Sequence, residues 1–181
     1  DIASGDGVLA ELLAPHSGRY VCIDASPRVV AAAAERLRRF ENVEVREGDM
    51  HALPLDDAGF DLVVLMHALT YAAKPAQAVA EAARVLRPGG QLLLSSLARH
   101  EHRAVVESYG HVNLGFTERE LRRFIDRAGL ALASSETVTR EKRPPHFEVV
   151  SLIARRPEKS APARLSIPSP RNAPGHPVPR E

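Results

Sequence analysis

The chain has few of the features that mark several large classes of protein. It contains one cysteine, Cys22, and no tryptophan in 181 residues. A single thiol excludes an intrachain disulfide and a zinc site built from several cysteines, and it fits a reducing compartment. Long apolar runs are also missing, because the longest, residues 62–73, is interrupted by His67 and is shorter than the roughly 20 residues of a membrane-spanning helix. We therefore predict no membrane segment and a cytoplasmic location.

Neither sign of charge dominates the sequence. Lysine and arginine together number 24, against 23 aspartates and glutamates, which gives a net charge of +1. Such a balance provides no electrostatic basis for nonspecific binding to nucleic acid or to an anionic membrane. The arginine-rich segments AERLRRF and RELRRF lack interleaved aromatic residues and are typical of solvated helix faces. We therefore expect no nucleic-acid partner for this domain.

Length and composition predict one domain, residues 1–156, followed by a tail. Residues 157–181 hold seven of the fourteen prolines and almost no apolar residues, so their burial cannot offset the entropy of ordering, and we expect them to be disordered. At the other end, Asp1 opens directly onto a turn that no apolar run precedes. We therefore expect further residues, including a strand, ahead of Asp1.

Between these ends, strand patterns alternate with helix patterns. Ser26-Pro27 and Pro75 begin helix-forming segments, and Thr117 with Glu120 forms a capping box before LRRFIDRAGL. Strand patterns cover residues 20–23, 43–46, 60–66 and 91–97, and LALASSETV and HFEVVSLIA follow without a helix between them. The sequence predicts an α/β fold with a doubly wound, mostly parallel sheet, seven strands if one precedes Asp1, and a C-terminal antiparallel hairpin.

Polar residues follow the ends of the predicted strands. The stretch DIASGDG opens the chain, Asp24 and Asp49 end the next two strands, and Met66-His67 end the fourth. Ligands of parallel α/β sheets bind beyond the carboxyl ends of the strands, so these residues should converge on one crevice. Asp24 lies 17 residues beyond Gly7, about where an acid binds the ribose hydroxyls of a nucleotide-bearing ligand.

The acids of the first turn discriminate between two such ligands. A dinucleotide would bring its pyrophosphate close to Asp1 and Asp6, and the third glycine of the GxGxxG pattern is absent. S-adenosylmethionine carries no phosphate but a sulfonium and an ammonium, which an acidic turn attracts. The turn therefore favours S-adenosylmethionine as the cofactor.

These segments resemble the class I S-adenosylmethionine-dependent methyltransferases. DIASGDG resembles the first motif of that family, and the likeness continues through VCIDAS, EGDMHALPLDDAGFDLVVLMHALTYAAKP and EAARVLRPGGQLLL, over residues 1 to about 97. Within the family the chain is most similar to the methyltransferase type 11 group, which includes ubiquinone and menaquinone methyltransferases. HVNLGFTERELRRFIDRAGL is also similar to methyltransferase domains of arsenic-repressor-type regulators, which carry an upstream winged helix.

The resemblance implies a Rossmann-like fold and methyl transfer to a small-molecule acceptor, with a homodimer and an upstream winged-helix domain as further expectations. It also implies the cofactor-binding residues. Asp1 and Gly5 would hold the methionine amino group, Asp24 the ribose diol and Asp49 the adenine amine, with Met50 against the ring; Ala3, Ala25 and Met66 would line the same site. Ala3 departs from the family, which usually has glycine there, and its methyl would crowd the ligand if the residue takes a positive φ.

The catalytic residue is not identified by these patterns. A general base is needed only if the acceptor loses a proton, and the candidates are His67, His100, His111 and Glu101. The histidines of segment 98–116 have no acidic or thiolate partner at ligand spacing, so we predict no metal. The same segment, with residues ahead of Asp1, would select the acceptor.

Structural readings of the site residues stay open beside the functional ones. Asp24 could cap the following helix, although Ser26 is better placed for that, and Asp49 could be an ordinary turn acid. His67 and Tyr71 could be buried polar groups. Three functions remain at this stage: a small-molecule methyltransferase, a sensor of S-adenosylmethionine or its demethylated product within a regulator, and a dinucleotide oxidoreductase.

Overall fold

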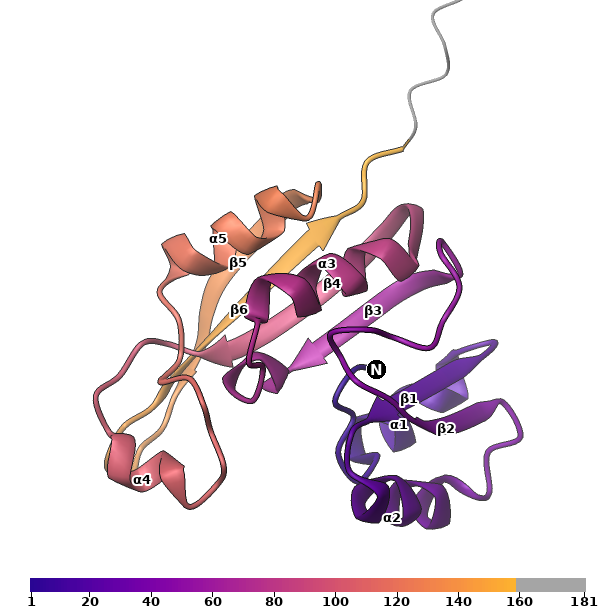
Figure 1. The fold of residues 1–181 in the computed structure, drawn as a ribbon, viewed down its shortest axis with the longest axis horizontal. Helices are drawn as coiled ribbons and strands as arrows, with labels where there is room; N and C mark the ends of the chain where they lie inside the picture. Colours follow the sequence, from indigo (N-terminus) through magenta and orange to yellow (C-terminus); the bar gives the residue numbers. More distant parts are fainter. Residues whose placement is uncertain (159–181) are drawn as a thin grey trace, which may run out of the picture.

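Six strands form two sheets in residues 1–158, the part of the chain that this computed structural model describes (Figure 1). In the smaller sheet β1 (Tyr20–Asp24) and β2 (Val43–Glu47) pair in parallel. The larger has the order β3 (Phe60–Met66), β4 (Leu86–Leu97), β6 (Glu148–Arg155), β5 (Ala131–Arg140). β3 and β4 are parallel, whereas β6 runs antiparallel to both β4 and β5. The fold is α/β with a mixed larger sheet; the predicted disordered tail lies, from residue 159, outside the described residues.

Residues 1–4 lie between the two sheets. Ile2 pairs with Ile23 of β1, and its amide donates to the carbonyl of Val64 in β3 at 3.0 Å. Beside this stretch a cavity of about 390 Å³ is lined by Asp1 and by residues 16–21 and 59–62. The described residues form six strands, one for each of the six strand patterns in this part of the sequence. The seventh strand, expected ahead of Asp1, stays a prediction.

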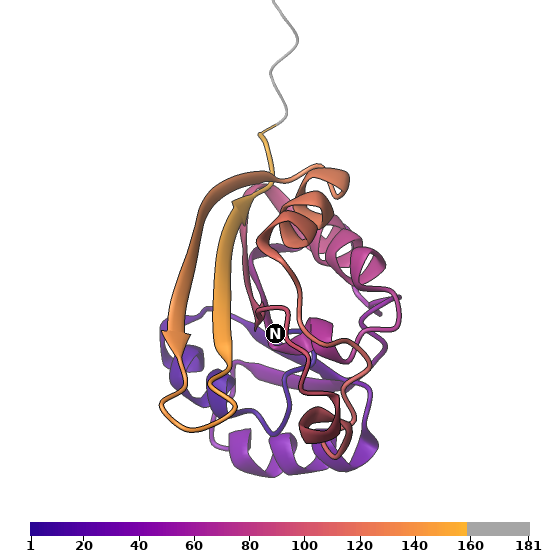
Figure 2. The same ribbon diagram turned by 90° about the vertical axis from the view of Figure 1, so that its left-hand side faces the viewer.

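Helices cover the strands from both sides. On one side α1 (Val8–Leu13) and α2 (Pro27–Leu37) contact each other, and α2 contacts β1 and β2. Over the larger sheet, α3 (Pro75–Val85) and α5 (Glu118–Arg127) lie on the same side, as Figure 2 shows. The short elements are η1 (Ala14–His16), η2 (Ala68–Thr70) and α4 (Arg103–Glu107). Among the described residues, helices on both faces, as the alternating patterns predicted, are found around β1, whereas the larger sheet has α3 and α5 on one face.

The side chains of β1 alternate between two cores. Tyr20 and Cys22 pack with Ala33 and Leu37 of α2, so the lone cysteine is a buried small apolar residue. Val21 and Ile23 belong to the larger core, which also includes the buried faces of α3 and α5. This alternation is the period of two that a strand with helices on both faces requires.

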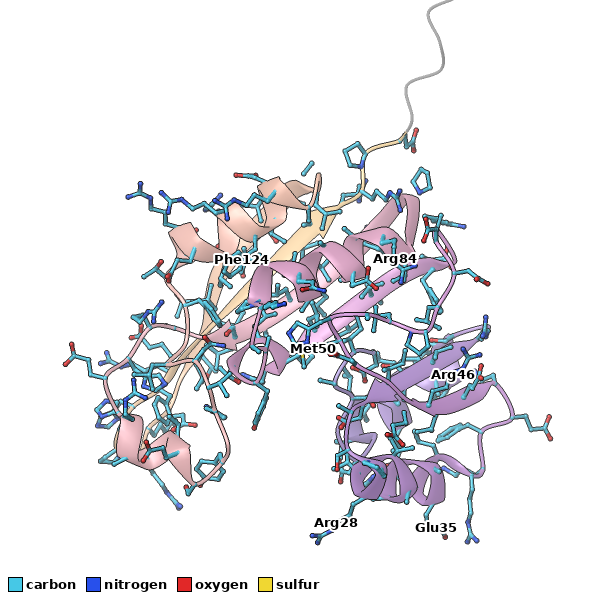
Figure 3. All side chains as sticks on the ribbon, viewed as in Figure 1. Arg28, Glu35, Arg46, Met50, Arg84 and Phe124 are labelled. Carbon is cyan, nitrogen blue, oxygen red and sulfur yellow. The ribbon has the colours of Figure 1, made fainter. Side chains whose placement is uncertain are left out.

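α5 forms where the sequence predicted it. The Thr117 hydroxyl accepts from the Glu120 amide at 3.2 Å and the Glu120 carboxylate accepts from the Thr117 amide at 2.8 Å, so the capping box is confirmed. Leu121 and Ile125 are fully buried, and Phe124, labelled in Figure 3, packs against the same core.

β3 is less buried than its apolar sequence predicts. Val63, Val64 and Leu65 are buried, but Leu62 is 47% exposed and Met66 is 37% exposed. Leu62 borders the cavity between β1 and β3, which leaves one edge of the strand uncovered. An apolar run such as FDLVVLM is typical of a strand buried on both faces, but the first half of β3 is not.

The segment that precedes β3 is fastened to α3. Arg84 donates to the carbonyls of Leu53 at 3.1 Å and Leu55 at 2.8 Å, and its guanidinium pairs with Asp57 at 2.7 Å. Figure 3 shows Arg84 on α3 and Met50 near the middle of the molecule. Because these bonds fix the chain that follows Met50, they hold the end of β2 against the larger sheet.

Candidate functional site

The glycine turn provides the first part of the site. Ala3, Gly5 and Gly7 all take left-handed backbone angles, with φ of 54°, 58° and 83°. A Cβ at Gly7 would lie 2.8 Å from Leu37, so this glycine lets the turn pack on α2. At Gly5 no atom lies within 4 Å of the place where a Cβ would project. The backbone at Gly5 therefore faces open space, which gives a ligand room to approach it.

Ala3 has a positive φ, the backbone conformation in which its methyl group is expected to crowd the ligand. A left-handed conformation costs an alanine roughly 1–2 kcal/mol because its Cβ approaches the following carbonyl oxygen. The turn keeps this angle because its neighbours fix it: the amide of Ser4 donates to the carbonyl of Ile23 at 3.0 Å. Ala3 thus has a strained backbone conformation in a turn whose other left-handed residues are glycines.

Asp24 joins this turn to the end of β1. Its Oδ2 accepts from the amide of Gly5 at 3.0 Å, and its Oδ1 accepts from the amide of Ser26 at 3.0 Å. Ser26 is the N-cap residue of α2, as predicted, but its side chain makes no capping hydrogen bond. A carboxylate has about four lone-pair positions, so the Asp24 carboxylate can accept further bonds from a ligand.

The two other acids of the turn are already partnered. The Asp1 carboxylate accepts from the Tyr20 hydroxyl at 3.1 Å, beside the cavity between β1 and β3. Asp6 is exposed and pairs with Arg36 at 2.8 Å, an ion pair in which Arg36 also contacts Glu11. The negative potential expected of the turn is therefore reduced at Asp6.

Asp49 is held by a neighbour that the sequence interpretation missed. Its Oδ1 accepts from the backbone amide of His51 at 2.8 Å and contacts the His51 ring nitrogen Nδ1 at 2.7 Å. The hydrogen bond from the His51 amide, and to a smaller extent that from the His51 ring, lowers the pKa of Asp49, so the carboxylate stays ionised. Both bonds use one oxygen, which leaves Oδ2 for a ligand. In the sequence, the sign of this pairing is a histidine two positions after the aspartate that follows Gly48.

His51 also connects Asp49 to the start of α3. Its Nε2 accepts from the amide of Lys74 at 3.2 Å, and its carbonyl accepts from the Gln77 side chain at 2.8 Å. These groups surround a cavity of about 300 Å³, lined by Asp49, His51, Ala52, Ala73, Lys74 and Gln77. The position of the Asp49 carboxylate is therefore set by tertiary contacts as well as by the turn.

The remaining predicted cofactor residues lie at the carboxyl ends of the strands. Ala25 is exposed directly after β1, and Met50 is half-buried after β2, packed against the larger core. Met66 ends β3, where its sulfur accepts from the Ser95 hydroxyl at 3.4 Å. The structure brings Gly5 and Asp24 into direct contact, whereas Ala25, Met50 and Met66 share only the end of the sheet.

His67 has an unusual backbone conformation for its type. It follows β3 with φ 56° and ψ 11°, in the left-handed region. The amide of His67 donates to the carbonyl of Ser95 at 3.0 Å, and its carbonyl accepts from the Thr70 hydroxyl at 2.8 Å. Desolvation by the surrounding protein lowers the pKa of the ring, although part of it reaches the surface. Strained residues fixed in this way are frequent at functional sites.

Segment 98–116 is fastened to η2, next to His67. The amides of Val112 and Asn113 both donate to the carbonyl of Thr70, at 2.9 and 3.0 Å. The Asn113 side chain donates to the carbonyls of Leu69 at 3.0 Å and Ala72 at 2.7 Å. Asn113 was not identified from the sequence, where its only signal is an amide between apolar residues.

This attachment places His111 beside Tyr71. The two rings meet edge to face, with centroids 4.8 Å apart. Burial lowers the pKa of His111, and the charge of His67 lowers it further. The attachment thus holds the chain at His111 to η2, which directly follows His67, although 44 positions separate the two histidines in the sequence.

The other candidate bases lie elsewhere on the segment. The centroid of the His100 ring lies 4.6 Å from that of Phe147 and 5.8 Å from that of His102. Burial lowers the pKa of His100, and nearby positive charge lowers it further. Glu101 is exposed. Among residues 1–158, no three potential ligands are arranged to hold a metal ion. In the same range no helix combines the length and the apolar character needed to span a membrane.

Comparison with known proteins agrees with this arrangement. Residues 1–94 match the family described as a methyltransferase domain. An uncharacterized 37.1 kDa protein in transposon TN4556 of Streptomyces fradiae is 47% identical over 88 residues, which are 49% of this chain and 25% of that protein. The demethylmenaquinone methyltransferase of Tropheryma whipplei is 32% identical over 111 residues, 60% of this chain and 45% of the enzyme. The chain thus spans between a quarter and a half of the length of these curated relatives.

A solved structure shows the same fold. The N-methyltransferase NodS of Bradyrhizobium japonicum, determined with S-adenosyl-L-homocysteine, superposes with a TM-score of 0.70 at 24% identity, covering 87% of this chain and 76% of that one. The family match extends over more than half of the chain and includes the glycine turn, Asp24, Asp49 and β3. The chain therefore belongs to the methyltransferase domain family and has the fold of class I methyltransferases.

Proposed function

We propose that the chain transfers a methyl group from S-adenosylmethionine to a small-molecule acceptor. The observation that carries the proposal is the Asp24 carboxylate. It ends β1, accepts from the Gly5 amide at 3.0 Å, and lies beside a glycine that no other atom covers. An acid in this position is suited to the two hydroxyls of a ribose, and the open backbone at Gly5 is suited to the chain attached to it.

The residues present fit this cofactor. Asp24 would hold the ribose diol and Asp49 Oδ2 the adenine amine, with Met50 against the ring. Gly5 would hold the methionine end, together with Asp1 once its carboxylate exchanges the Tyr20 hydroxyl at the start of β1 for the ligand, and Ala3, Ala25 and Met66 would line the site. When bound, S-adenosylmethionine supplies a methyl group activated by a sulfonium, so the protein has mainly to orient the acceptor and exclude water.

The proposal covers residues 1–156 as the catalytic domain and a small molecule as the acceptor. The name of the Tropheryma relative suggests an acceptor related to a quinone precursor. The upstream winged helix, the homodimer and the cytoplasmic location remain predictions.

Isothermal calorimetry and a transfer assay test the proposal together. We expect S-adenosylmethionine and S-adenosylhomocysteine to bind, NAD to bind poorly, and labelled methyl to pass from S-adenosylmethionine to an organic acceptor in a metabolite extract. Tight binding of NAD without binding of either sulfur ligand would contradict the proposal. Binding of the sulfur ligands without transfer to any acceptor would instead favour the sensing function.

A further inference from the structure

Four aromatic rings gather beside the end of β3, and the proposed cofactor contacts do not use them. His111 lies between Tyr71, with ring centroids 4.8 Å apart, and Tyr109, at 6.2 Å. His67 is the fourth ring, and its charge acts on His111. We call His67, Tyr71, Tyr109 and His111 the aromatic cluster. It lies next to Met66, one of the proposed cofactor residues, and so on the path to a transferable methyl group.

The surface around the cluster is unusually apolar for exposed residues. Tyr71 is 46% exposed, Tyr109 68% and Val112 62%. Aromatic side chains left open to solvent are common where a protein binds a flat, apolar partner. The chemistry of the cluster therefore suits an uncharged aromatic ring.

One polar atom of the cluster lacks a protein partner. Nδ1 of His111 is buried and makes no hydrogen bond within residues 1–158. Buried polar atoms of native proteins are normally paired, so an unpaired one calls for an explanation. The ring is not free to search for a partner, since Asn113 and Val112 fasten the chain beside it to η2. Because Nδ1 has no exposed area, a hydroxyl that enters the cluster can donate to it once it displaces a side chain that covers it.

We infer that the aromatic cluster binds an acceptor with an aromatic hydroxyl group, and that His111 takes the hydroxyl proton as the methyl is transferred. The inference rests on the methyl transfer proposed above. In this step the bond between the acceptor oxygen and the methyl carbon forms, and the bond between that carbon and sulfur breaks with its electron pair left on sulfur. The proton passes to His111 and from there to solvent.

The other histidines are less suited to this role. His100 also has an unpaired buried nitrogen, Nε2, but its ring packs on Phe147 and His102, away from both tyrosines. His67 is fixed by its backbone bonds at the end of β3, where its ring would orient the acceptor. The rings that pack against His111 are Tyr71 from the β3 end and Tyr109 from its own segment.

A binding experiment tests the inference without turnover. The full chain is saturated with S-adenosylhomocysteine and titrated with 4-methylphenol, while the histidine ring signals are followed by NMR and assigned with single His→Gln variants. We expect the signals of His111 and His67 to shift and that of His102 to stay in place. Absence of any shift, or an equal shift at His102, overturns the inference.

A kinetic experiment tests the proton transfer. 4-Methylphenol keeps its proton near neutral pH, whereas 4-nitrophenol is largely ionised at mildly alkaline pH and needs no base. We expect His111→Gln to lower kcat for 4-methylphenol by about 100-fold or more, the usual contribution of a general base, and to affect 4-nitrophenol far less. The matched variant His102→Gln should leave both rates unchanged. Equal losses on the two phenols, or a greater loss in His67→Gln than in His111→Gln, overturn the assignment.

The failure of this inference can be told apart from that of the proposed function. If the native chain does not bind S-adenosylhomocysteine, the proposed function fails. If it binds this ligand and methylates amines or carbon acids but neither phenol, the inference alone fails. Unchanged binding of S-adenosylhomocysteine by His111→Gln shows that the variant is folded, and the NMR titration of the native chain decides the matter if it is not.

Discussion

The proposed cofactor side and the proposed acceptor side of the site are held in different ways. The cofactor side comprises residues 1–7, Asp24 and Asp49, where short backbone turns present amides and carboxylates. The acceptor side comprises residues 66–72 and segment 98–116, which is held to η2 by Asn113 across 41 and 44 positions of sequence. The first side combines short turns with hydrogen bonds from other segments, such as those of Lys74 and Gln77 to His51, whereas the second depends on a few distant hydrogen bonds. Each side can therefore be altered without altering the other.

Asp24→Ala should produce the largest effect, confined to the cofactor side. Loss of the hydrogen bonds to a charged acceptor should weaken S-adenosylmethionine binding by on the order of 2–4 kcal/mol. Calorimetry measures the change, and circular dichroism checks the fold, since Asp24 also holds two amides. The control is Asp61→Ala, an exposed acid of β3 paired with Arg87, which should bind the ligand normally. An unchanged dissociation constant for Asp24→Ala would remove Asp24 from the site.

Asn113→Ala should weaken the acceptor side alone. It removes the side-chain donor of the Leu69 and Ala72 carbonyls, although the Ala72 amide still donates to that of Leu69, which should lower the free energy of unfolding by roughly 1–3 kcal/mol and raise KM for the acceptor. Asn42→Ala is a matched control, since Asn42 clamps the carbonyls of Ala14 and Ser17 at 2.8 and 2.7 Å in the other half of the molecule. Urea denaturation should find a similar loss of stability in both variants. If both raise the acceptor KM equally, the two sides are not separable.

Ala3→Gly should stabilise the cofactor side. Glycine takes the positive φ of this position without steric cost, so we expect a gain of about 0.5–1 kcal/mol in the free energy of unfolding. The same replacement at Ala32, an exposed position in α2, should cost about 1 kcal/mol because it loosens a helix. Thermal unfolding of the two variants should therefore shift in opposite directions. Destabilisation by Ala3→Gly would mean that the packing of the Ala3 methyl group stabilises the fold by more than the positive φ costs.

The smallest expected effect is a pH dependence of stability that comes from Glu120, just after segment 98–116. Arg99 and the Thr117 amide lower the pKa of Glu120 to about 2, from an ordinary value of 4.5. Because the pKa in the folded state is the lower one, the stabilisation is present above about pH 4.5 and is lost as the pH falls toward 2. The melting temperature of the native chain should thus fall more steeply over this range than that of Glu120→Gln. Equal slopes would show that the ion pair contributes nothing.

Part of the fold and of the cofactor side could be predicted because local chemistry specifies them. The capping box at Thr117 and Glu120, the alternation of β1 and the glycine turn are each set by residues within a few positions of one another. The order in which the strands pair could not be predicted, because pairing depends on which segment lies at each edge. β3 appeared doubly buried in sequence, yet Leu62 is exposed beside the cavity between the sheets.

The sequence by itself determined the family, the order of helices and strands, and the position of the cofactor acids at the strand ends. Only the tertiary structure decided that Asp24 receives the Gly5 amide, that His51 holds Asp49, and that His111 stands beside Tyr71. The physical reason is the range of the interactions. Turns and caps are fixed by backbone geometry within one segment, whereas a side chain such as His111 is placed by hydrogen bonds that form only after distant segments have packed together.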